Sequence, residues 1–322
     1  TLGLMAAISA MNGLSVAGAM RLYGGQITLD GDLTSSATGD IFIKSLSSAN
    51  PSIQVNGNIR KTGGGRSTLT LQGQGRVLLV GSIQASGTAL DTVLWSDYDN
   101  SKNDGGVTLA TGSSISTNGG HLWAGGSSSN GGSTTWNGLP VGNGASIGST
   151  GYNNNALDLY GSVNTAGGDV LLWAGNGVNN VNGIRTNRTG SIQAGSGNVT
   201  LIADGTWDTL PITTTGVLSL VPHEGSYGGP INWVGSVSGG HLNLTSAYNG
   251  MQIRNVANLG GLSLGRYSGM GALVADNTSD VTILSALSIA GSIAIRGGGV
   301  TINRALSAGG DITLAATDIN AD

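Results

Sequence analysis

Near the end of this chain the same strand-like unit returns after nineteen residues. Val-Thr-Ile at residues 281–283 recurs at residues 300–302, and the alternating run at residues 293–295 recurs at residues 312–314. Both units are short apolar–polar–apolar runs bounded by glycine, a pattern typical of β-strands rather than of helices. Two or three short strands in a period of this length predict one turn of a parallel β-solenoid, whose coils stack about 4.8 Å apart.

The same unit, with variation, occurs along most of the 322 residues. Its upstream copies lie at residues 14–16, 20–22, 26–29, 40–43, 67–71, 106–109, 198–201 and 241–244. The 58 glycines disfavour helices, since each glycine in a helix interior costs about 1 kcal/mol relative to alanine. We therefore predict an all-β fold with almost no helix, in which residues 1–322 form a single β-solenoid rod with coils of about nineteen residues.

Longer polar or glycine-rich stretches interrupt the repeat. They lie near residues 91–104, 125–146, 175–188, 204–211 and 221–230. We interpret them as loop insertions that emerge from the rod, where contact with a ligand is expected. Because they cluster before residue 231, the first two thirds of the rod should carry most of the insertions.

Composition excludes several classes of function. Charged residues make up 9% of the chain and its net charge is −4, so there is no basic surface to neutralise nucleic-acid phosphates. The chain contains no cysteine, which excludes disulfides, thiolate metal ligands and a thiol nucleophile. Hydrophobic residues reach 39%, which is enough for a buried core. We predict a folded protein without a nucleic-acid partner.

The residues that usually carry catalysis form no recognisable constellation. A G-x-S-x-G pattern surrounds Ser146, but that motif requires a strand-to-helix turn, and no helix is predicted to follow it. His121 and His241 both follow Gly-Gly at the start of a strand, where Asp169 and Asp311 stand in other coils, so we interpret these histidines as polar turn residues. Other aspartates are scattered rather than paired. We therefore predict that the chain is not an enzyme and needs no cofactor.

Two groups of residues are candidate metal ligands. Asp97, Asp99 and Asp104 form the densest acidic patch and could supply oxygen ligands to calcium, although their spacing does not match an EF-hand loop. A solvated loop rich in turns explains this patch as well. His223 and Glu224 share a loop, but two ligands are too few for a typical zinc site. No metal site is predicted, and calcium binding at the acidic patch stays open.

Two tryptophans are the candidates for ligand contact. Trp136 and Trp207 stand in polar stretches beside asparagine or aspartate, which are the surroundings in which sugar rings stack on an indole. The alternative is that each indole caps its loop against the rod. We keep both interpretations and name Trp136 and Trp207 as the candidate glycan contacts.

Several segments resemble the repeats of filamentous haemagglutinin-like exoproteins, which are large bacterial adhesins commonly exported by two-partner secretion. The resemblance is carried by residues 93–97, 106–109, 114–125 and 167–175. It implies a right-handed parallel β-helix located outside the cell, on the bacterial surface, with an outer-membrane secretion partner and without catalytic residues. Residues 1–20 lack the Asn-rich motifs of the secretion domain of these proteins, so the resemblance is to an interior repeat region.

The leading hypothesis is a non-enzymatic structural and adhesive segment of a secreted filament or adhesin that mediates attachment to cells or surfaces, with surface glycans as candidate partners. The alternative is a carbohydrate-active β-helix, such as a polysaccharide lyase or hydrolase or a phage tailspike. An ice-binding solenoid is a third hypothesis, disfavoured because the threonines form no unbroken register. We also expect unfinished sheet edges that pair end to end with further repeats or neighbouring copies.

Overall fold

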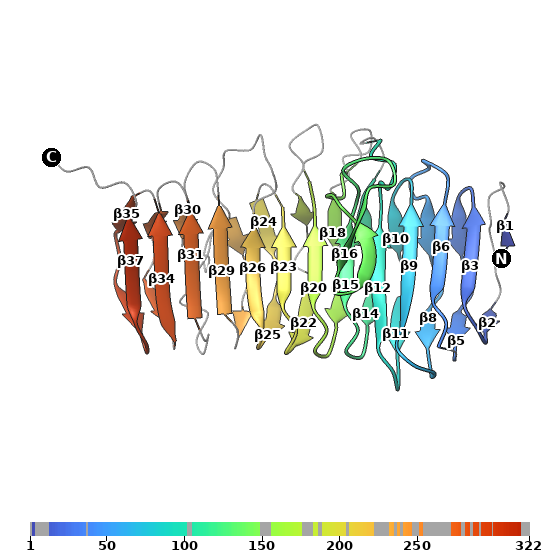
Figure 1. Cartoon of the computed structure of the whole chain (residues 1–322), viewed down its shortest axis with the longest axis horizontal. Helices are drawn as coiled ribbons and strands as arrows, with labels where there is room; N and C mark the ends of the chain where they lie inside the picture. The colour runs from blue at the N-terminus through green and yellow to red at the C-terminus, as the bar shows by residue number, and fades with distance from the viewer. Residues whose placement is uncertain are drawn as a thin grey trace.

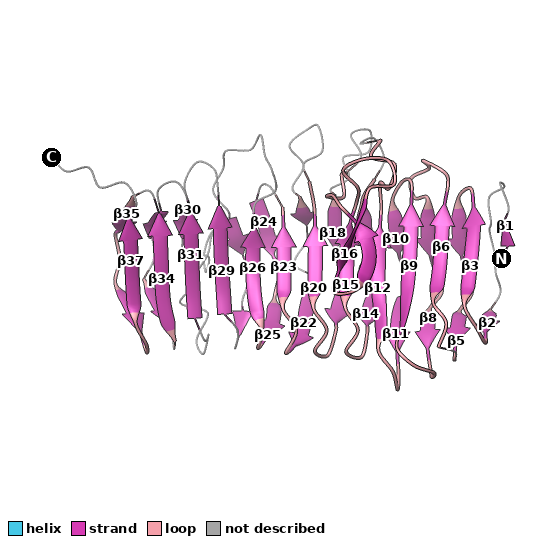
Figure 2. Cartoon of the chain, viewed as in Figure 1, coloured by secondary structure: helices cyan, strands magenta, loops and turns pink. Residues whose placement is uncertain are grey.

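The computed structural model is a parallel β-solenoid whose coils stack along one long axis (Figure 1). The structure describes residues 2–3, 13–36, 38–101, 105–148, 156–175, 183–185, 189–203, 206–221, 232–234, 237–238, 241–246, 251–253, 272–277, 281–283, 286–289, 291–297 and 299–316. These residues form strands, turns and bends, and none of them is helical (Figure 2). In this part of the chain there is accordingly no helix long and apolar enough to cross a membrane.

The longest sheet, here called sheet 1, contains one strand from almost every coil. Its thirteen strands are parallel, and neighbours in the sheet follow one another along the rod. They are β1 (Leu2–Gly3), β3 (Met20–Gly24), β6 (Ile41–Ser45), β9 (Ser67–Gly73), β12 (Leu90–Trp95), β15 (Leu122–Gly125), β20 (Val170–Trp173), β23 (Val199–Ile202), β26 (Val217–Val221), β29 (His241–Ser246), β31 (Ala272–Asn277), β34 (Ser292–Gly297) and β37 (Ile312–Ala316).

Sheet 2 follows sheet 1 in the course of each coil. Its six strands are β4 (Ile27–Leu29), β7 (Ile53–Val55), β10 (Val77–Leu79), β13 (Val107–Leu109), β18 (Leu157–Leu159) and β21 (Ile184–Arg185). Two smaller parallel sheets occupy the same place in the chain order of later coils, since each of their strands also comes after a strand of sheet 1. They are β24 (Thr206–Thr209) with β27 (Asn232–Val234), and β30 (Met251–Ile253) with β32 (Val281–Ile283) and β35 (Val300–Ile302).

Sheet 3 completes the coil before the chain returns to sheet 1. Its nine strands are β2 (Leu14–Val16), β5 (Leu33–Ser35), β8 (Ile59–Lys61), β11 (Ser82–Ala85), β14 (Ser114–Ser116), β19 (Ser162–Asn164), β22 (Ser191–Gly195), β25 (Ile212–Thr214) and β28 (Val237–Ser238). A separate pair, β33 (Leu287–Ile289) and β36 (Leu306–Ala308), takes this place near the end of the rod.

The core of the rod is built from columns of like side chains in register. Ile43, Leu71, Leu94 and Ala124 are successive partners along sheet 1, and each is 2% exposed or less. Alternation along each strand sends these residues inward and their neighbours outward. The predicted strands around residues 26–29, 40–43, 67–71, 106–109, 198–201 and 241–244 are confirmed as β4, β6, β9, β13, β23 and β29.

Coil length is less uniform than the sequence predicts. Val199 pairs with Leu218 and Ile293 pairs with Ile312, which gives nineteen residues per coil in both places. In contrast, Leu122 pairs with Val170, forty-eight residues later. Nineteen residues are therefore the length of the compact coils, and the other coils are longer because they carry longer turns or insertions.

Two of the predicted loops contain strands of the rod. Within residues 91–104, the first five residues belong to β12, whose side chains are all buried, so the loop prediction is wrong for that part. Within residues 204–211, β24 pairs in parallel with β27. Both stretches contain Asp and Trp, residue types that are also common in loops, so the sequence alone does not distinguish these strands from loops.

The other three predicted insertions differ in kind. Residues 125–146 contain an antiparallel hairpin formed by β16 (Ser133–Trp136) and β17 (Leu139–Gly142). Residues 175–188 include the sheet-2 strand β21, and residues 176–182 and 186–188 lie outside the described residues. The prediction at 221–230 begins with the last residue of β26, and its remainder lies outside the described residues.

Candidate functional site

The most elaborate surface feature among the described residues is the β16–β17 hairpin, which packs on the outer side of sheet 1. Val93, Trp95 and Trp123 belong to β12 and β15 but do not join the core of the rod. They form a second apolar cluster with Leu139 and Val141 of the hairpin. The hairpin therefore covers apolar side chains that point outward from two neighbouring coils.

The indoles of this cluster hold the hairpin base in place. The rings of Trp95 and Trp123 meet edge to face, with centroids 6.2 Å apart and an interplanar angle of 75°. This arrangement suits the quadrupoles of two aromatic rings. Nε1 of Trp95 donates a hydrogen bond to Oγ of Ser127 at 2.9 Å, so the buried indole nitrogen is satisfied.

A tight two-residue turn places the hairpin tip over the start of the sheet-1 strands. Trp136 pairs with Leu139, and Asn137 and Gly138 between them have φ values of 48° and 78°. Positive φ at both positions is the geometry of a type I′ turn, for which Asn-Gly is the preferred sequence. As a result, the Asn137 side chain reaches back to the rod.

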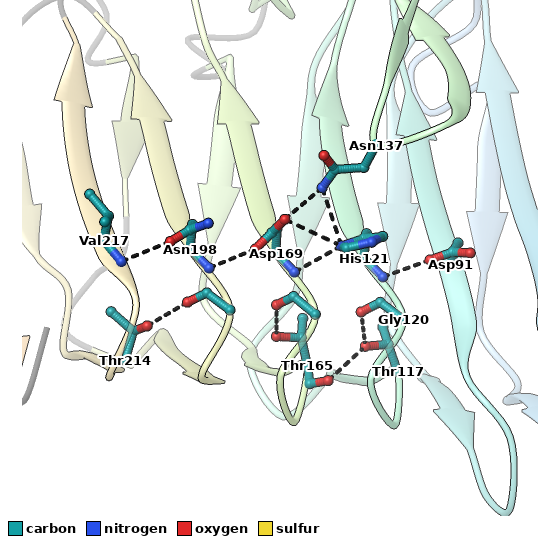
Figure 3. Close-up of polar contacts among 12 residues, drawn as sticks. Asp91, Thr117, Gly120, His121, Asn137, Thr165, Asp169, Asn198, Thr214 and Val217 are labelled. Carbon is teal, nitrogen blue, oxygen red and sulfur yellow. Dashed lines mark hydrogen bonds and ion pairs between the residues drawn. The ribbon is translucent and has the colours of Figure 1, made fainter.

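At the tip, Asn137 meets a histidine and an aspartate from neighbouring coils (Figure 3). Its Nδ2 donates to Oδ2 of Asp169 at 2.7 Å and lies 3.3 Å from Nδ1 of His121. The His121 ring packs edge to face against Trp136, with centroids 5.7 Å apart. Nδ1 of His121 also accepts the backbone N–H of Asp169 at 2.9 Å.

The contact between His121 and Asp169 is one step in a ladder that runs along the rod. In each step, a polar side chain just before a sheet-1 strand or within its first two residues accepts the backbone N–H at the same position of the following coil. We call these positions the strand-start column. Its donor N–H and acceptor pairs are Thr68–Asp40 (2.8 Å), His121–Asp91 (2.7 Å), Asp169–His121 (2.9 Å), Asn198–Asp169 (2.7 Å), Val217–Asn198 (2.9 Å) and Asp311–Ser292 (3.2 Å).

A column of glycines directly precedes the strand-start column and explains the recurrent Gly-Asp and Gly-His pairs. A Cβ added at Gly168 would lie 1.9 Å from the carbonyl oxygen of Gly120, and one at Gly197 would lie 2.1 Å from that of Gly168. At these two corners the chain rests on the backbone of the previous coil, so only glycine fits there. Leu90 and Ser67 take the equivalent place before Asp91 and Thr68. The sequence-based interpretation of His121 as a polar turn residue is confirmed.

Threonines at the end of the sheet-3 strands tie the same corner together. The hydroxyl of Thr117 donates to the carbonyl of Gly120, and Thr165 donates in the same way to Gly168 (Figure 3). Thr214 instead donates to Gly197, which lies in the preceding coil. These buried hydroxyls satisfy carbonyl groups at the turn into sheet 1.

Arg66 forms an ion pair with Asp91 of the strand-start column. Nε and Nη2 of Arg66 donate to the two carboxylate oxygens of Asp91 at 2.7 and 2.6 Å. Asp91 is only 3% exposed, and its Oδ1 additionally accepts the N–H of His121. Hydrogen bonding to Asp91 is the main cause that raises the pKa of Arg66.

A second ion pair lies on the outer side of sheet 2, and both of its side chains are buried. Arg76 contacts Oδ2 of Asp158 at 3.1 Å and also bonds to Thr108. Burial lowers the pKa of Arg76, opposed by the charge of Asp158. The hydroxyl of Tyr160 donates to Oδ1 of Asp158 at 2.9 Å, and burial, followed by the charge of Asp158, raises the pKa of Tyr160 to about 12. The buried charges of Arg76 and Asp158 therefore partner each other, as expected of an ion pair that belongs to the fold rather than to a reactive site.

Of the two candidate tryptophans, Trp136 has a described side chain. Trp136 is half-buried at the edge of the hairpin cluster, where it contacts His121. Trp207 lies in β24, and its side chain is outside the described part of the structure. Among the described side chains, Trp136 lies together with the polar residues of the strand-start column.

The other candidate residues are placed as follows. Ser146 is buried, with its hydroxyl bonded to Ser96 and to the carbonyl of Ala156, so it is not presented at a nucleophile turn. Asp97 is buried and Asp99 accepts a hydrogen bond from Gln74, so these two do not form an open acidic patch. Asp104, His223 and the side chain of His241 lie outside the described residues. Within the described residues, no three potential metal ligands come together.

The hairpin and its docking to the rod were missed by the sequence analysis. The signal is present, because Asn137-Gly138 stands between two runs of four residues that can pair as strands. Its three-dimensional neighbours could not be foreseen, since His121 and Asp169 lie sixteen and thirty-two residues away from Asn137.

Comparisons with protein-family models, with curated proteins and with solved structures gave no match to this chain.

Proposed function

We propose that this chain is a non-enzymatic structural and adhesive segment of a secreted bacterial surface filament or adhesin. The observation that carries the proposal is the single sheet of thirteen parallel strands that runs the length of the rod. Each coil contacts chiefly its neighbours, so such a fold supplies reach and can be lengthened coil by coil. The resemblance to filamentous haemagglutinin-like repeats supports a surface location and export through an outer-membrane partner.

We further propose that the solenoid winds to the right. Parallel strands of one sheet that are joined by a crossover are right-handed in about 98% of cases. Where the connecting residues are described, successive sheet-1 strands are joined through strands of sheets 2 and 3 or of the smaller sheets, which makes these coils crossovers of this kind.

Exposed apolar side chains on β37, in the last described coil, support a proposal about what packs against the rod there. In the last described coil, Ile312 and Leu314 are 45% and 46% exposed, whereas their partners Ile293 and Ile295 in the preceding coil are at most 1% exposed. Exposed apolar strand edges pair readily with further strands. We propose that another coil of the same kind covers this edge, supplied by further repeats or by a neighbouring copy.

The hairpin is the proposed contact element for surface glycans. Trp136 offers a half-buried indole beside Asn137 and Asp169, a combination that suits a sugar ring. Trp207 stays a second candidate.

A glycan array and a cell-binding assay test the adhesive function. The wild-type chain should bind, and Trp136→Ala should bind at least about tenfold more weakly if the hairpin makes the contact. Thr134→Ala, on the exposed strand β16, is the matched control. Absence of binding by the wild type to any cell or glycan would contradict an adhesive role. Cleavage of a polysaccharide that is lost on replacing one aspartate would favour a carbohydrate-active enzyme instead.

A further inference from the structure

The acceptor at His121 differs chemically from its neighbours in the strand-start column. At the other described steps the acceptor is an oxygen of Asp, Asn or Ser, and at this step it is the Nδ1 lone pair of an imidazole. Amide and hydroxyl oxygens and ionised carboxylates keep their lone pairs around neutral pH. An imidazole loses its free lone pair when it is protonated, which for histidine generally occurs between about pH 5 and 8.

Two N–H donors converge on this lone pair. The backbone N–H of Asp169 lies 2.9 Å from Nδ1 and Nδ2 of Asn137 lies 3.3 Å from it. Since Nδ1 must accept, the ring in this structure is assigned as the neutral form with its proton on Nε2. If Nδ1 were also protonated, it would become an N–H donor. It would then point at the two N–H donors that it now accepts.

Protonation therefore acts on the hairpin tip in either of two ways. If the ring keeps its place, Asn137 and the backbone of Asp169 lose their acceptor on Nδ1. If the ring moves toward Oδ2 of Asp169, which is 3.7 Å from Nδ1, it competes with Asn137, which already donates to that oxygen at 2.7 Å. Both routes weaken the attachment of Asn137 to the rod.

The charged groups around His121 are few among the described contacts. Asp169 faces the ring from the coil that follows, and Asp91 faces the backbone of His121 from the coil that precedes. Asp91 is held by Arg66 on both of its oxygens. The hairpin contributes two uncharged groups, Trp136 and Asn137. The carboxylate of Asp169 is thus the group toward which an imidazolium would move.

We propose that His121 is a pH-sensitive latch for the β16–β17 hairpin. The neutral ring holds the tip against sheet 1, and protonation releases Asn137 and loosens the exposed strand β16, while Leu139 and Val141 keep the base of the hairpin packed. This inference rests on the contacts of His121 and does not depend on the proposed adhesive function.

Hydrogen–deuterium exchange of the full chain at about pH 5 and about pH 7.5 tests the latch, after correction for the chemical exchange rate. The reporter is the peptide that covers residues 133–142, and β6 serves as a remote reference for an intact rod. His121→Asn is the matched variant, because Asn198 already fills the same column position with a side chain that accepts an N–H but does not titrate.

In the wild type, protection of the hairpin should fall about fivefold to tenfold at the lower pH, the size of effect that one lost hydrogen bond produces. In His121→Asn, protection should be the same at both pH values. Asn137→Ala tests the latch from the hairpin side, and its protection should be low and independent of pH even if His121→Asn does not fold. The latch is contradicted if the wild-type hairpin shows no pH dependence, or if either variant keeps the wild-type change.

Discussion

Oδ1 of Asp91 accepts the backbone N–H of His121 at 2.7 Å, although thirty residues of chain separate them. The same relationship links Asp169 to Asn198 at 2.7 Å and Asn198 to Val217 at 2.9 Å. Carboxylates that accept backbone N–H groups make comparatively strong, charge-assisted hydrogen bonds. The strand-start column thus fixes the register of sheet 1 from outside the apolar core.

Replacing Asp91 should destabilise the rod strongly. Asp91→Ala removes the acceptor for His121 and leaves the half-exposed Arg66 without its bidentate partner, so we expect a loss of about 1–3 kcal/mol in the free energy of unfolding. Urea unfolding followed by circular dichroism measures this. Asp30→Ala, which removes an exposed acceptor of Asn56, should change stability by less than about 0.5 kcal/mol. Equal effects of the two variants would contradict the role of Asp91.

The glycine column predicts a steric effect that depends on position. Gly168→Ala would place a Cβ 1.9 Å from the backbone of the previous coil and should cost about 1–3 kcal/mol or more. Gly18 stands at the equivalent corner near the start of the rod, where no described atom lies within 4 Å of an added Cβ. Gly18→Ala should therefore be close to neutral. Thermal unfolding of both variants checks this contrast.

Burial of the Lys61 ammonium group should lower the free energy of unfolding of the rod at neutral pH. Its side chain is 1% exposed, and no described residue accepts a hydrogen bond from Nζ. Burial lowers the pKa of Lys61, opposed by the charge of Asp40, so the unfolded state binds the proton more tightly. Stability should therefore rise with pH from the lowered folded pKa to the unfolded value near 10.4.

Lys61→Met should remove this dependence and stabilise the rod by about 1–2 kcal/mol at pH 7. Urea unfolding at pH 7 and at about pH 9.5 measures both effects, with a smaller gain expected at the higher pH. Lys44→Met is the control, because Lys44 lies over the Tyr98 ring, 4.2 Å from its centroid, and should lose rather than gain stability. A destabilised Lys61→Met protein would contradict the prediction.

The raised pKa of Tyr160 predicts that the free energy of unfolding falls at alkaline pH. Its pKa is raised to about 12 in the folded state, against about 10 for an unfolded tyrosine. Between these values the unfolded state releases the proton first, so the stabilisation is present below about pH 10 and is lost as pH rises through the folded pKa. Tyr160→Phe should remove one late step from the tyrosinate absorbance titration and flatten the alkaline loss of stability. An unchanged titration would show that Tyr160 is not the perturbed group.

The sequence predicts the strands and the equivalence of His121 and Asp169, because alternation and the Gly-Gly motif are local signals. It does not predict that Asp91 and Trp95 are buried in a strand, since their burial depends on Arg66 and on the hairpin, which are distant in sequence. The length of the longer coils cannot be predicted from the sequence alone either. A compact coil can be read from the spacing of like strands, whereas the position of an insertion within a coil depends on which strands finally pair.

The central claim is that the chain winds into stacked coils, and distances between spin labels test it most directly. Because the chain has no cysteine, labels can be attached to cysteines introduced pairwise on sheet 3. Thr34, Arg60, Gln84, Ser116, Asn164, Gln193 and Thr213 are successive partners in that sheet. With Thr34 as the fixed site, the distance should grow by about 4.8 Å per coil, reaching about 24 Å at Gln193 and about 29 Å at Thr213. Distances that do not increase in even steps along this series would contradict the solenoid.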